Sequence, residues 1–261
     1  MATVRVATLN LLNNPHGRWQ DREGLVLAQA REVDADVYAF QEVAARTDQV
    51  ERVLAALGPD FAAVTLPNPD ATSSKSLAIV TRLEVVERSS CTDLPAGDLA
   101  LRADVAAADG PPFSVVTTHL LFGPSPRGNA IRRAQAEHLL RWLDEALEPT
   151  VLLGDFNSSD DDGAVGLLKE HFRSAHGDVH GREPDVTHPT PLVHALDVEK
   201  AFGVPMFPDD GGAAVDYVFV RGAVEIVSCA VAWDVPAAHE PDLYPSDHFG
   251  LVADLRFGAG R

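Results

Sequence analysis

Six strand-like segments of this chain each carry polar residues at one end, and this pattern limits the possible folds more than any other feature. Their sequences are TVRVATLN, DVYAFQE, SVVTTH, VLLGDFN, AVDYVFV and PSDHFGLVADL. Apolar runs and alternating patterns of this length are typical of β-strands. In enzymes built on sheets, polar groups from several strand ends converge on one site. The sequence therefore predicts a β-rich protein with a functional site at a sheet edge.

The stretch VLLGDFN is the most informative of these segments. Val151 to Leu153 is expected to form a buried strand, with Gly154 at its exit. Side chains two positions apart on a strand project from the same face. Asp155 and Asn157 are therefore expected side by side, where a carboxylate and an amide suit a water molecule or a hard cation. The alternative is a strand end followed by an Asx turn.

Length and composition indicate one domain over residues 1–261 and an acidic surface. The 46 % hydrophobic content is sufficient for a core, and no Pro/Gly/Ser-rich linker divides the chain. The 21 Lys and Arg residues against 39 Asp and Glu residues give a net charge of −18, which repels polyanions. Two cysteines make a disulfide framework unexpected. No signal peptide or membrane span is visible, so a cytoplasmic location is expected.

The rest of the chain is expected to contain a few helices outside many strands. Asp48 with Glu51 predicts an N-cap pair for a helix that Gly58 and Pro59 end. The acidic run Asp160–Asp162 is interpreted as a helix cap rather than a metal site. The other expectations are helices over 20–33 and 131–143, strand structure over most of 61–117, an irregular segment over 171–211, and strands over 215–220, 224–233 and 249–257.

The order of the motifs resembles the endonuclease/exonuclease/phosphatase superfamily, which includes deoxyribonuclease, abasic-site endonucleases, neutral sphingomyelinases, inositol polyphosphate phosphatases and deadenylases. The matching motifs span residues 8 to 248 and are TLN (Asn10), QEV (Glu42), THL (His119), GDFN (Asp155, Asn157), DYVFV (Asp216) and SDH (Asp247, His248). The resemblance implies an α/β (α+β) four-layer sandwich, in which two packed, mixed but mostly antiparallel sheets are flanked by helices.

The resemblance also implies a metal site. It places Asn10, Glu42 and Asp247 near a magnesium ion, for which manganese is a possible substitute. Magnesium prefers oxygen ligands and takes few of them from the protein. In several family members an acid follows TLN two residues later, and here Leu12 stands there. A second metal ion is therefore less expected.

The resemblance implies hydrolysis of a phosphoester by an activated water. His248 would be the general base, and Asp216 would orient it. Asp155 and Asn157 would orient the water or stabilise the pentacovalent phosphorus, and His119 would donate to a non-bridging oxygen. For His119 the alternative is a core histidine, and for Asp216 it is a plain strand cap.

Several other residues are candidates for weaker roles. Arg127, placed in the loop after THL, is the candidate for binding a phosphate, whereas Lys75 is interpreted as a solvated loop lysine. Arg132 and Gln135 form an RxxQ pair with an expected structural role. Trp19 and Arg22 resemble the W-x-x-R of some deadenylase-like members, for which packing is favoured. Leu77 stands where many members have Asn or Glu.

Five of the ten histidines lie within residues 171–194. Their spacing matches no zinc motif, so structural zinc is not expected there. The segment is interpreted as a substrate-selecting loop between GDFN and DYVFV.

The hypothesis from the sequence is a magnesium-dependent hydrolase acting on ester bonds of a small or lipid-like phosphate compound, either a monoester or a diester. One alternative is an endo- or exonuclease acting on DNA or RNA, although duplex nucleic acid is an unfavoured partner for so acidic a chain. Another is a catalytically inactive binding module on the same fold. The oligomeric state stays open.

Overall fold

The structure is a computed structural model that describes residues 3–45, 47–70, 73–107, 110–123, 125–159, 163–196 and 212–258. Within these ranges the strands form two six-stranded sheets. In spatial order, one sheet contains β11 (Val224–Ala232), β12 (Gly250–Phe257), β1 (Thr3–Asn10), β2 (Val37–Gln41), β4 (Leu77–Thr81) and β3 (Ala62–Leu66). The other contains β5 (Glu84–Cys91), β6 (Ala100–Ala106), β7 (Phe113–His119), β8 (Thr150–Asp155), β10 (Asp216–Arg221) and β9 (Arg173–Ser174).

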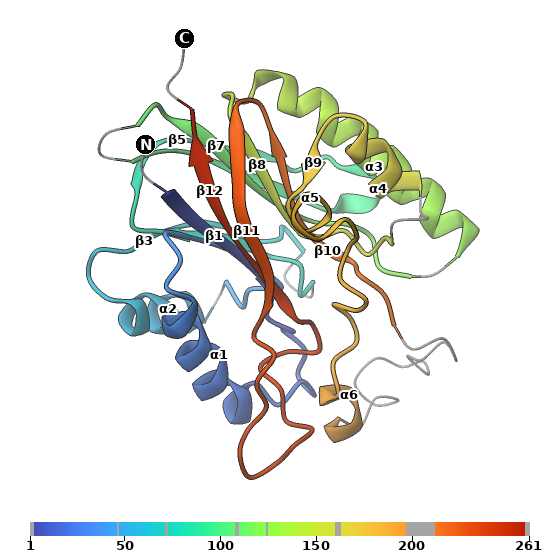
Figure 1. Cartoon of the computed structure of the whole chain (residues 1–261). Helices are drawn as coiled ribbons and strands as arrows, with labels where there is room; N and C mark the ends of the chain where they lie inside the picture. Colours follow the sequence, from blue (N-terminus) through green and yellow to red (C-terminus); the bar gives the residue numbers. More distant parts are fainter. Residues whose placement is uncertain are drawn as a thin grey trace.

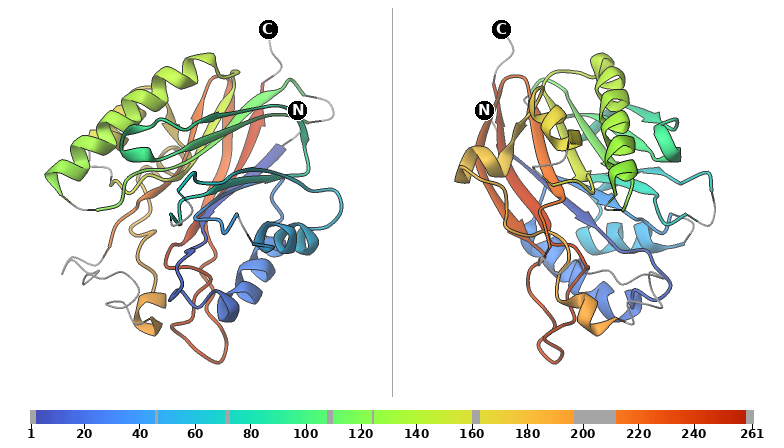
Figure 2. Two further views of the ribbon diagram at one scale, coloured as in Figure 1. Left: turned by 180° about the vertical axis from the view of Figure 1, so that it is seen from behind. Right: turned by 90° about the vertical axis from the view of Figure 1, so that its right-hand side faces the viewer.

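The two sheets pack face to face, and helices cover their outer faces (Figures 1 and 2). Helices α1 (Trp19–Val33) and α2 (Gln49–Leu57) lie on the sheet that contains β1, with an apolar layer between them. Helices α3 (Pro126–Trp142) and α4 (Gly163–Lys169) cover the sheet that contains β8 in the same way. The four-layer sandwich expected from the sequence is confirmed.

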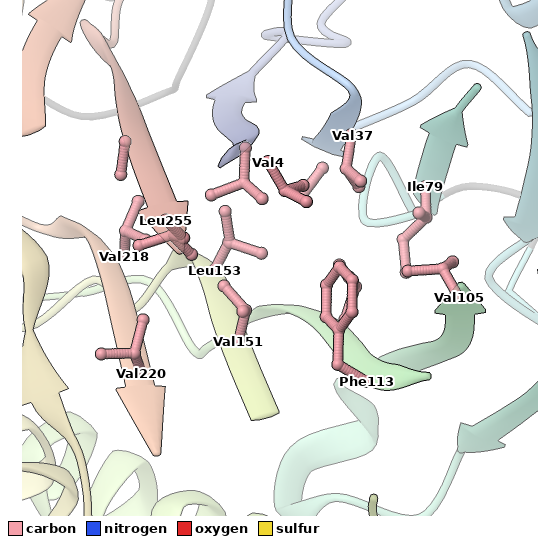
Figure 3. Close-up of a cluster of buried hydrophobic side chains, with 14 of the residues drawn as sticks. Val4, Val37, Ile79, Val105, Phe113, Val151, Leu153, Val218, Val220 and Leu255 are labelled. Carbon is pink, nitrogen blue, oxygen red and sulfur yellow. The ribbon is translucent and has the colours of Figure 1, made fainter. Parts of the chain in front are cut away.

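The core between the sheets consists of inward-facing branched side chains from both sheets. Figure 3 shows Val4 and Val37 facing Val151 and Leu153, while the Phe113 ring fills the space near Val105. Each fully buried side chain of this size contributes about 1.5–3 kcal/mol by leaving water. Alternation of apolar and polar residues along β12 places Leu251, Ala253 and Leu255 in this core.

A buried polar link also joins the sheets near the functional edge. Gln41, at the end of β2, donates from Nε2 to Thr117 Oγ1 on β7 at 2.8 Å. The same amide pairs with Thr8 Oγ1 on β1. Because an unpaired buried amide is costly, this link specifies how the end of β2 faces the end of β7.

Each sheet has one parallel pair at its centre. β1 is parallel to β2, and β7 is parallel to β8, whereas the other pairs are antiparallel. The sheets are thus mixed and mostly antiparallel, as expected. The carboxyl ends of both parallel pairs meet at one edge of the sandwich, since Asn10 at the end of β1 contacts Asp155 at the end of β8.

Two of the expected local features were wrong. Asp48 precedes α2 but its side chain makes no capping hydrogen bond. The segment expected to be irregular contains β9, α5 (Ala175–His180) and α6 (Leu192–Ala195) within its described part.

Gly58 ends α2, as expected. The acidic run at 160–162 and residues 197–211 lie outside the described residues. Short 3₁₀ turns occupy Pro95–Gly97 and Leu143–Glu145.

None of the helices in the described ranges is long and apolar enough to cross a bilayer.

Gly154 is required by the close approach of β8 to β7. Its φ is +147°, and a Cβ atom added there would lie 2.1 Å from the Thr118 carbonyl oxygen. The glycine before Asp155 therefore reflects backbone contact between the two parallel strands that carry His119 and Asp155.

Replacing Gly154→Ala is expected to lower the free energy of unfolding by at least about 2 kcal/mol, because both the backbone conformation and the contact with Thr118 oppose a side chain. Urea unfolding measures this change. Gly24→Ala is the matched control. Gly24 lies in α1, and no atom lies within 4 Å of the place that a Cβ would take there. Alanine at that position is therefore expected to stabilise by about 0.5–1 kcal/mol. Equal stability of the two variants would contradict the conclusion that the contact with Thr118 requires glycine at position 154.

Candidate active site

Polar side chains from both sheets form one largely buried cluster at the edge where the central strands end. Four of them end β1, β7 and β8 or follow β2, and three lie at the start of β10 or just before β12. They are Asn10, Glu42, His119, Asp155, Asp216, Asp247 and His248. The structure therefore brings together seven of the nine site residues expected from the sequence.

Asp155 Oδ2 lies at the centre of this cluster. It accepts a hydrogen bond from Asn10 Nδ2 at 3.0 Å. His119 Nε2 lies 3.3 Å from the same oxygen, and His248 Nε2 lies 3.6 Å from it. Burial raises the pKa of the Asp155 carboxyl, and the nearby His248 opposes this shift. One carboxylate oxygen thus faces three side chains from three different strand ends.

His248 and Asp216 form a close imidazole–carboxylate pair. His248 Nδ1 lies 2.9 Å from Asp216 Oδ2, and both residues are buried. Burial alone would lower the pKa of His248, but the Asp216 and Asp155 carboxylates outweigh it and raise that pKa well above its ordinary value. Thr187 Oγ1 accepts the backbone N–H of Asp216, which fixes the start of β10. This pairing leaves Nε2 of His248 directed at the centre of the cluster.

His119 is held as a neutral imidazole. Burial lowers its pKa well below the ordinary value, and the positive charges of Lys75 and His248 lower it further. Its Nδ1 is buried and has no hydrogen-bond partner among the described residues. A buried unpaired ring nitrogen is costly, so this atom is available to a ligand.

Glu42 and Asp247 have the donor chemistry for a hard cation. Burial raises the pKa of Glu42, and the neighbouring Asp247 carboxylate raises it further. Glu42 also has a φ of +52°, a conformation that is rare outside glycine and common at functional sites. Two adjacent carboxylates with oxygen ligands fit magnesium or manganese, and a divalent ion would relieve their repulsion. The residues therefore fit the metal that the sequence implies.

The side-chain nitrogen of Asn10 faces the carboxylates of Glu42 and Asp155. Its Nδ2 donates to Glu42 Oε1 at 3.2 Å as well as to Asp155. Its Oδ1 accepts the backbone N–H of Leu12. Ligation of a metal through Oδ1 would require the amide to turn over. Leu12, which stands where several family members have an acid, is buried in an apolar cluster with Leu192 and Leu243. This position therefore provides no ligand for a metal.

Asn157 does not extend the strand face as expected. β8 ends at Asp155, and Asn157 has a φ of 48°. Its backbone N–H donates to Asp155 Oδ1 at 2.8 Å, which is the alternative Asx turn. Its side chain instead donates to the carbonyl of Leu120, the residue after His119.

Two basic residues also differ from expectation. Arg127 is exposed in the first turn of α3 and not in the preceding loop. Lys75 is not a solvated lysine, because its side chain is only 20 % exposed and its Nζ lies 2.7 Å from buried Asp98 Oδ1. The Lys75 charge acts on both His119 and Glu42, so it lies close to the cluster.

The RxxQ pair has the expected structural role. Arg132 donates to the carbonyls of Leu121 and Gly123. Gln135 donates to Asp98 Oδ2 and accepts the backbone N–H of Leu121. These bonds anchor the loop that follows His119.

His188 belongs beside the cluster, although nothing in the sequence pattern separates it from the other histidines of its tract. Its ring lies on that of His248, with centroids 4.4 Å apart. Burial lowers the pKa of His188 to about 4, and the nearby His248 contributes to this shift. His171, His176 and His180 are not part of the cluster; His180, for example, contacts the Cys229 carbonyl.

Arg22 connects the loops that carry the candidate metal ligands. Its fully buried guanidinium donates to the carbonyls of Leu11, Leu12, Gly17 and Pro245. Burial lowers its pKa to about 10, while the Asp247 and Glu42 carboxylates oppose that shift. Arg22 therefore fixes the chain after Asn10 against the chain before Asp247, and the expected packing role is confirmed.

Comparison with known proteins assigns the class. The model of the Endonuclease/Exonuclease/phosphatase family matches residues 7–248. The chain belongs to this family, whose members are hydrolases of phosphoester bonds, nucleases and phosphatases among them, and are generally metal-dependent.

Nocturnin from Drosophila melanogaster is 23 % identical over 275 residues, covering 91 % of this chain and 42 % of that protein. The chain thus spans less than half the length of this curated relative. Among solved structures, an endonuclease/exonuclease/phosphatase from Bacteroides vulgatus has a TM-score of 0.77 at 23 % identity and covers 99 % of this chain and 100 % of its own. The human Nocturnin catalytic domain with bound sulfate has a TM-score of 0.76 at 20 % identity. The aligned region covers 98 % of this chain and 95 % of that domain.

TDP2 from D. rerio, solved in complex with a single-strand DNA product, has a TM-score of 0.76 at 17 % identity. The aligned region covers 98 % of this chain and 100 % of that one. At these identities the structural likenesses establish the fold.

Replacing Arg22→Met is expected to lower the free energy of unfolding by about 3–5 kcal/mol, because several buried carbonyls lose their donor together. Arg31→Met on the same helix is the control. Arg31 is exposed and donates to the Ala56 carbonyl, so its loss is expected to cost less than about 1 kcal/mol. Urea unfolding of both variants provides the comparison. A small change in the free energy of unfolding for Arg22→Met would show that Arg22 does not hold the two loops together.

Proposed function

We propose that this protein is a magnesium-dependent phosphoesterase that hydrolyses a phosphomonoester or phosphodiester with a water activated by His248 and Asp216. The observation that carries the proposal is the buried His248–Asp216 pair, 2.9 Å apart, whose free ring nitrogen faces Asp155 beside Glu42 and Asp247. Manganese is a possible substitute for magnesium.

His248 would act as the general base. In the neutral ring, Nδ1–H would donate to Asp216, and Nε2 would carry the lone pair that accepts a water proton. The Asp216 and Asp155 carboxylates stabilise the imidazolium that forms when the proton arrives. The separation of 3.6 Å between His248 Nε2 and Asp155 Oδ2 is too long for a direct hydrogen bond, and a water held by both groups would be oriented for attack.

Glu42 and Asp247 would hold the metal, with Asn10 positioning the carboxylates or, after rotation of its amide, binding as well. When bound, a divalent ion supplies positive charge to the phosphoryl oxygens. Arg22 would keep the two ligand-bearing loops at a fixed separation.

Neutral His119 would contact the phosphoryl group, whereas Asn157 would do so only with its amide turned from the Leu120 carbonyl. A neutral imidazole can donate a hydrogen bond to a non-bridging oxygen without a change of charge. Lys75 adds a positive charge nearby, and its contact with Asp98 orients it toward the loop after His119. Arg127, exposed at the start of α3, stays a candidate for binding a distal phosphate.

We favour a small or lipid-like phosphate compound as the substrate. The chain carries a net charge of −18, which opposes the approach of a long polyanion. The second candidate is a nuclease acting on single-stranded ends, which is favoured by the fold shared with TDP2 in complex with a single-strand DNA product. A catalytically inactive binding module is disfavoured because the cluster retains a paired base and adjacent carboxylates.

His248→Asn is expected to lower the rate of hydrolysis by about 10²–10⁴, because the attacking water loses its base. The measurement is release of product from a panel of phosphate esters with magnesium, with and without a chelator. His171→Ala is the control, since His171 is exposed on the same chain and is expected to keep full activity. Normal turnover by His248→Asn on a verified substrate would refute the mechanism, and a wild type inactive with every ester and metal would favour the binding module.

Long duplex DNA is expected to be a poor substrate, because few basic residues are available for the phosphate contacts that duplex binding needs. The test incubates supercoiled plasmid with catalytic amounts of protein and magnesium at low salt, beside a single-stranded oligonucleotide. Little nicking is expected. Efficient nicking by the wild type, and none by His248→Asn, would instead support the nuclease.

A further inference from the structure

His188 places a second imidazole beside the Asp247 carboxylate and the His248 ring. Its Nε2 lies 3.9 Å from Asp247 Oδ2, too far for a hydrogen bond. Ligand atoms of His188, Asp247 and His248 all lie within 4.8 Å of one another. Asp247 and His248 are buried, and the His188 side chain is 15 % exposed. The three groups therefore lie close together, and solvent reaches them where His188 is partly exposed.

The backbone around His188 is tied to both catalytic strand ends. His188 and Ala213 exchange backbone hydrogen bonds of 3.1 and 2.9 Å. Thr187 accepts the N–H of Asp216 through its Oγ1 and the N–H of Phe249 through its carbonyl. Thr190 donates its N–H to the Asp247 carbonyl. The backbone that carries the imidazole is thus fixed before any ligand arrives, which lowers the cost of binding an ion.

We propose that His188, Asp247 and His248 form a zinc site, and that zinc bound there inhibits the enzyme. Two imidazoles and one carboxylate are a ligand set that zinc uses, whereas magnesium prefers oxygen alone. Zinc–ligand bonds of about 2.0–2.2 Å place tetrahedral ligand atoms roughly 3.3–3.6 Å apart. The separation of 3.9 Å between His188 and Asp247 would have to shorten by roughly 0.3–0.6 Å, and the other pairs, which lie within 4.8 Å, by at most about 1.5 Å.

Inhibition follows from the use of His248. A ring nitrogen of His248 that binds an ion has no lone pair for the proton of the attacking water. The site also shares Asp247 with the candidate magnesium site, so the two ions compete for one carboxylate. The inhibitory part of this inference rests on the proposed function, but zinc binding does not.

The chain offers a matched control, because another group of potential ligands contains none of the residues of the catalytic cluster. Cys91, Asp93 and His138 also place ligand atoms within 4.8 Å of one another, at the end of β5 and on α3. In that group the Asp93 side chain is 77 % exposed, and its Oδ1 accepts a hydrogen bond from Cys91 Sγ at 3.2 Å. His138→Phe removes this second group and leaves His188 intact.

The first experiment measures zinc binding to metal-free protein by competition with a chromophoric chelator. Wild type and His138→Phe are expected to bind with equal affinity, and His188→Phe is expected to bind at least roughly tenfold more weakly, since one of three protein ligands is lost. His188→Gln is the second variant in case the larger ring disturbs folding. Zinc affinity unchanged in both folded His188 variants, or lost in His138→Phe, would overturn the site.

The second experiment follows hydrolysis of bis(p-nitrophenyl) phosphate, or of the best ester found, at saturating magnesium with increasing zinc. Each variant is normalised to its own rate without zinc. The zinc concentration that halves the rate is expected to rise at least roughly tenfold in His188→Phe. An unchanged midpoint would overturn the inhibitory role. If the wild type hydrolyses no ester, the proposed function fails, and the binding comparison alone then decides whether the zinc site exists.

Discussion

The contacts of one oxygen atom, Oδ2 of Asp155, hold the candidate site together. A buried carboxylate loses its hydration and is stable only where donors replace the water. Here Asn10, at the end of β1, donates to it, and two imidazoles from distant parts of the chain lie close by. His119, at the end of β7, has its Nε2 3.3 Å from Oδ2, and His248, just before β12, has its Nε2 3.6 Å from it. The other carboxylate oxygen of Asp155 accepts the Asn157 N–H. The carboxylate thus aligns the ends of strands from both sheets, and loss of any donor would leave part of a buried charge without a partner.

The sheet topology explains why these donors meet. Each sheet has a central parallel pair, β1 with β2 and β7 with β8. Their carboxyl ends lie at the same edge of the sandwich. The polar groups there belong to the last residue of β1, β7 and β8 and to the residue that follows β2. Strands β10 and β12 run antiparallel to those pairs. Their polar residues reach the same edge only from the start of a strand, so Asp216 begins β10 and His248 precedes β12.

The parts of this arrangement that depend on local pattern could be predicted from the sequence. Alternation and apolar runs identified the strands, and the order of the motifs identified the residues at their ends. For Asn157 the local alternative, an Asx turn on Asp155, is the one that forms, and its side chain donates to the Leu120 carbonyl, 37 residues earlier. Lys75 was misread because its partner, Asp98, is 23 residues away. His188 was hidden in a histidine-rich tract, and only its packing on His248 distinguishes it. Tertiary partners of this kind leave no periodic trace.

The charges around the site explain why its chemistry calls for a cation. Glu42, Asp155, Asp216 and Asp247 place four carboxyl groups in or beside the buried cluster. The fixed positive charges close to them already have partners within the protein, since Lys75 contacts Asp98 and Arg22 contacts backbone carbonyls. An anionic phosphoester would therefore meet a negative field unless a divalent ion were present. The same carboxyl groups that would repel the substrate are the ligands that attract that ion. Metal binding and substrate binding would thus be coupled by charge, and an adjacent imidazole such as His188 would influence which metal the cluster prefers.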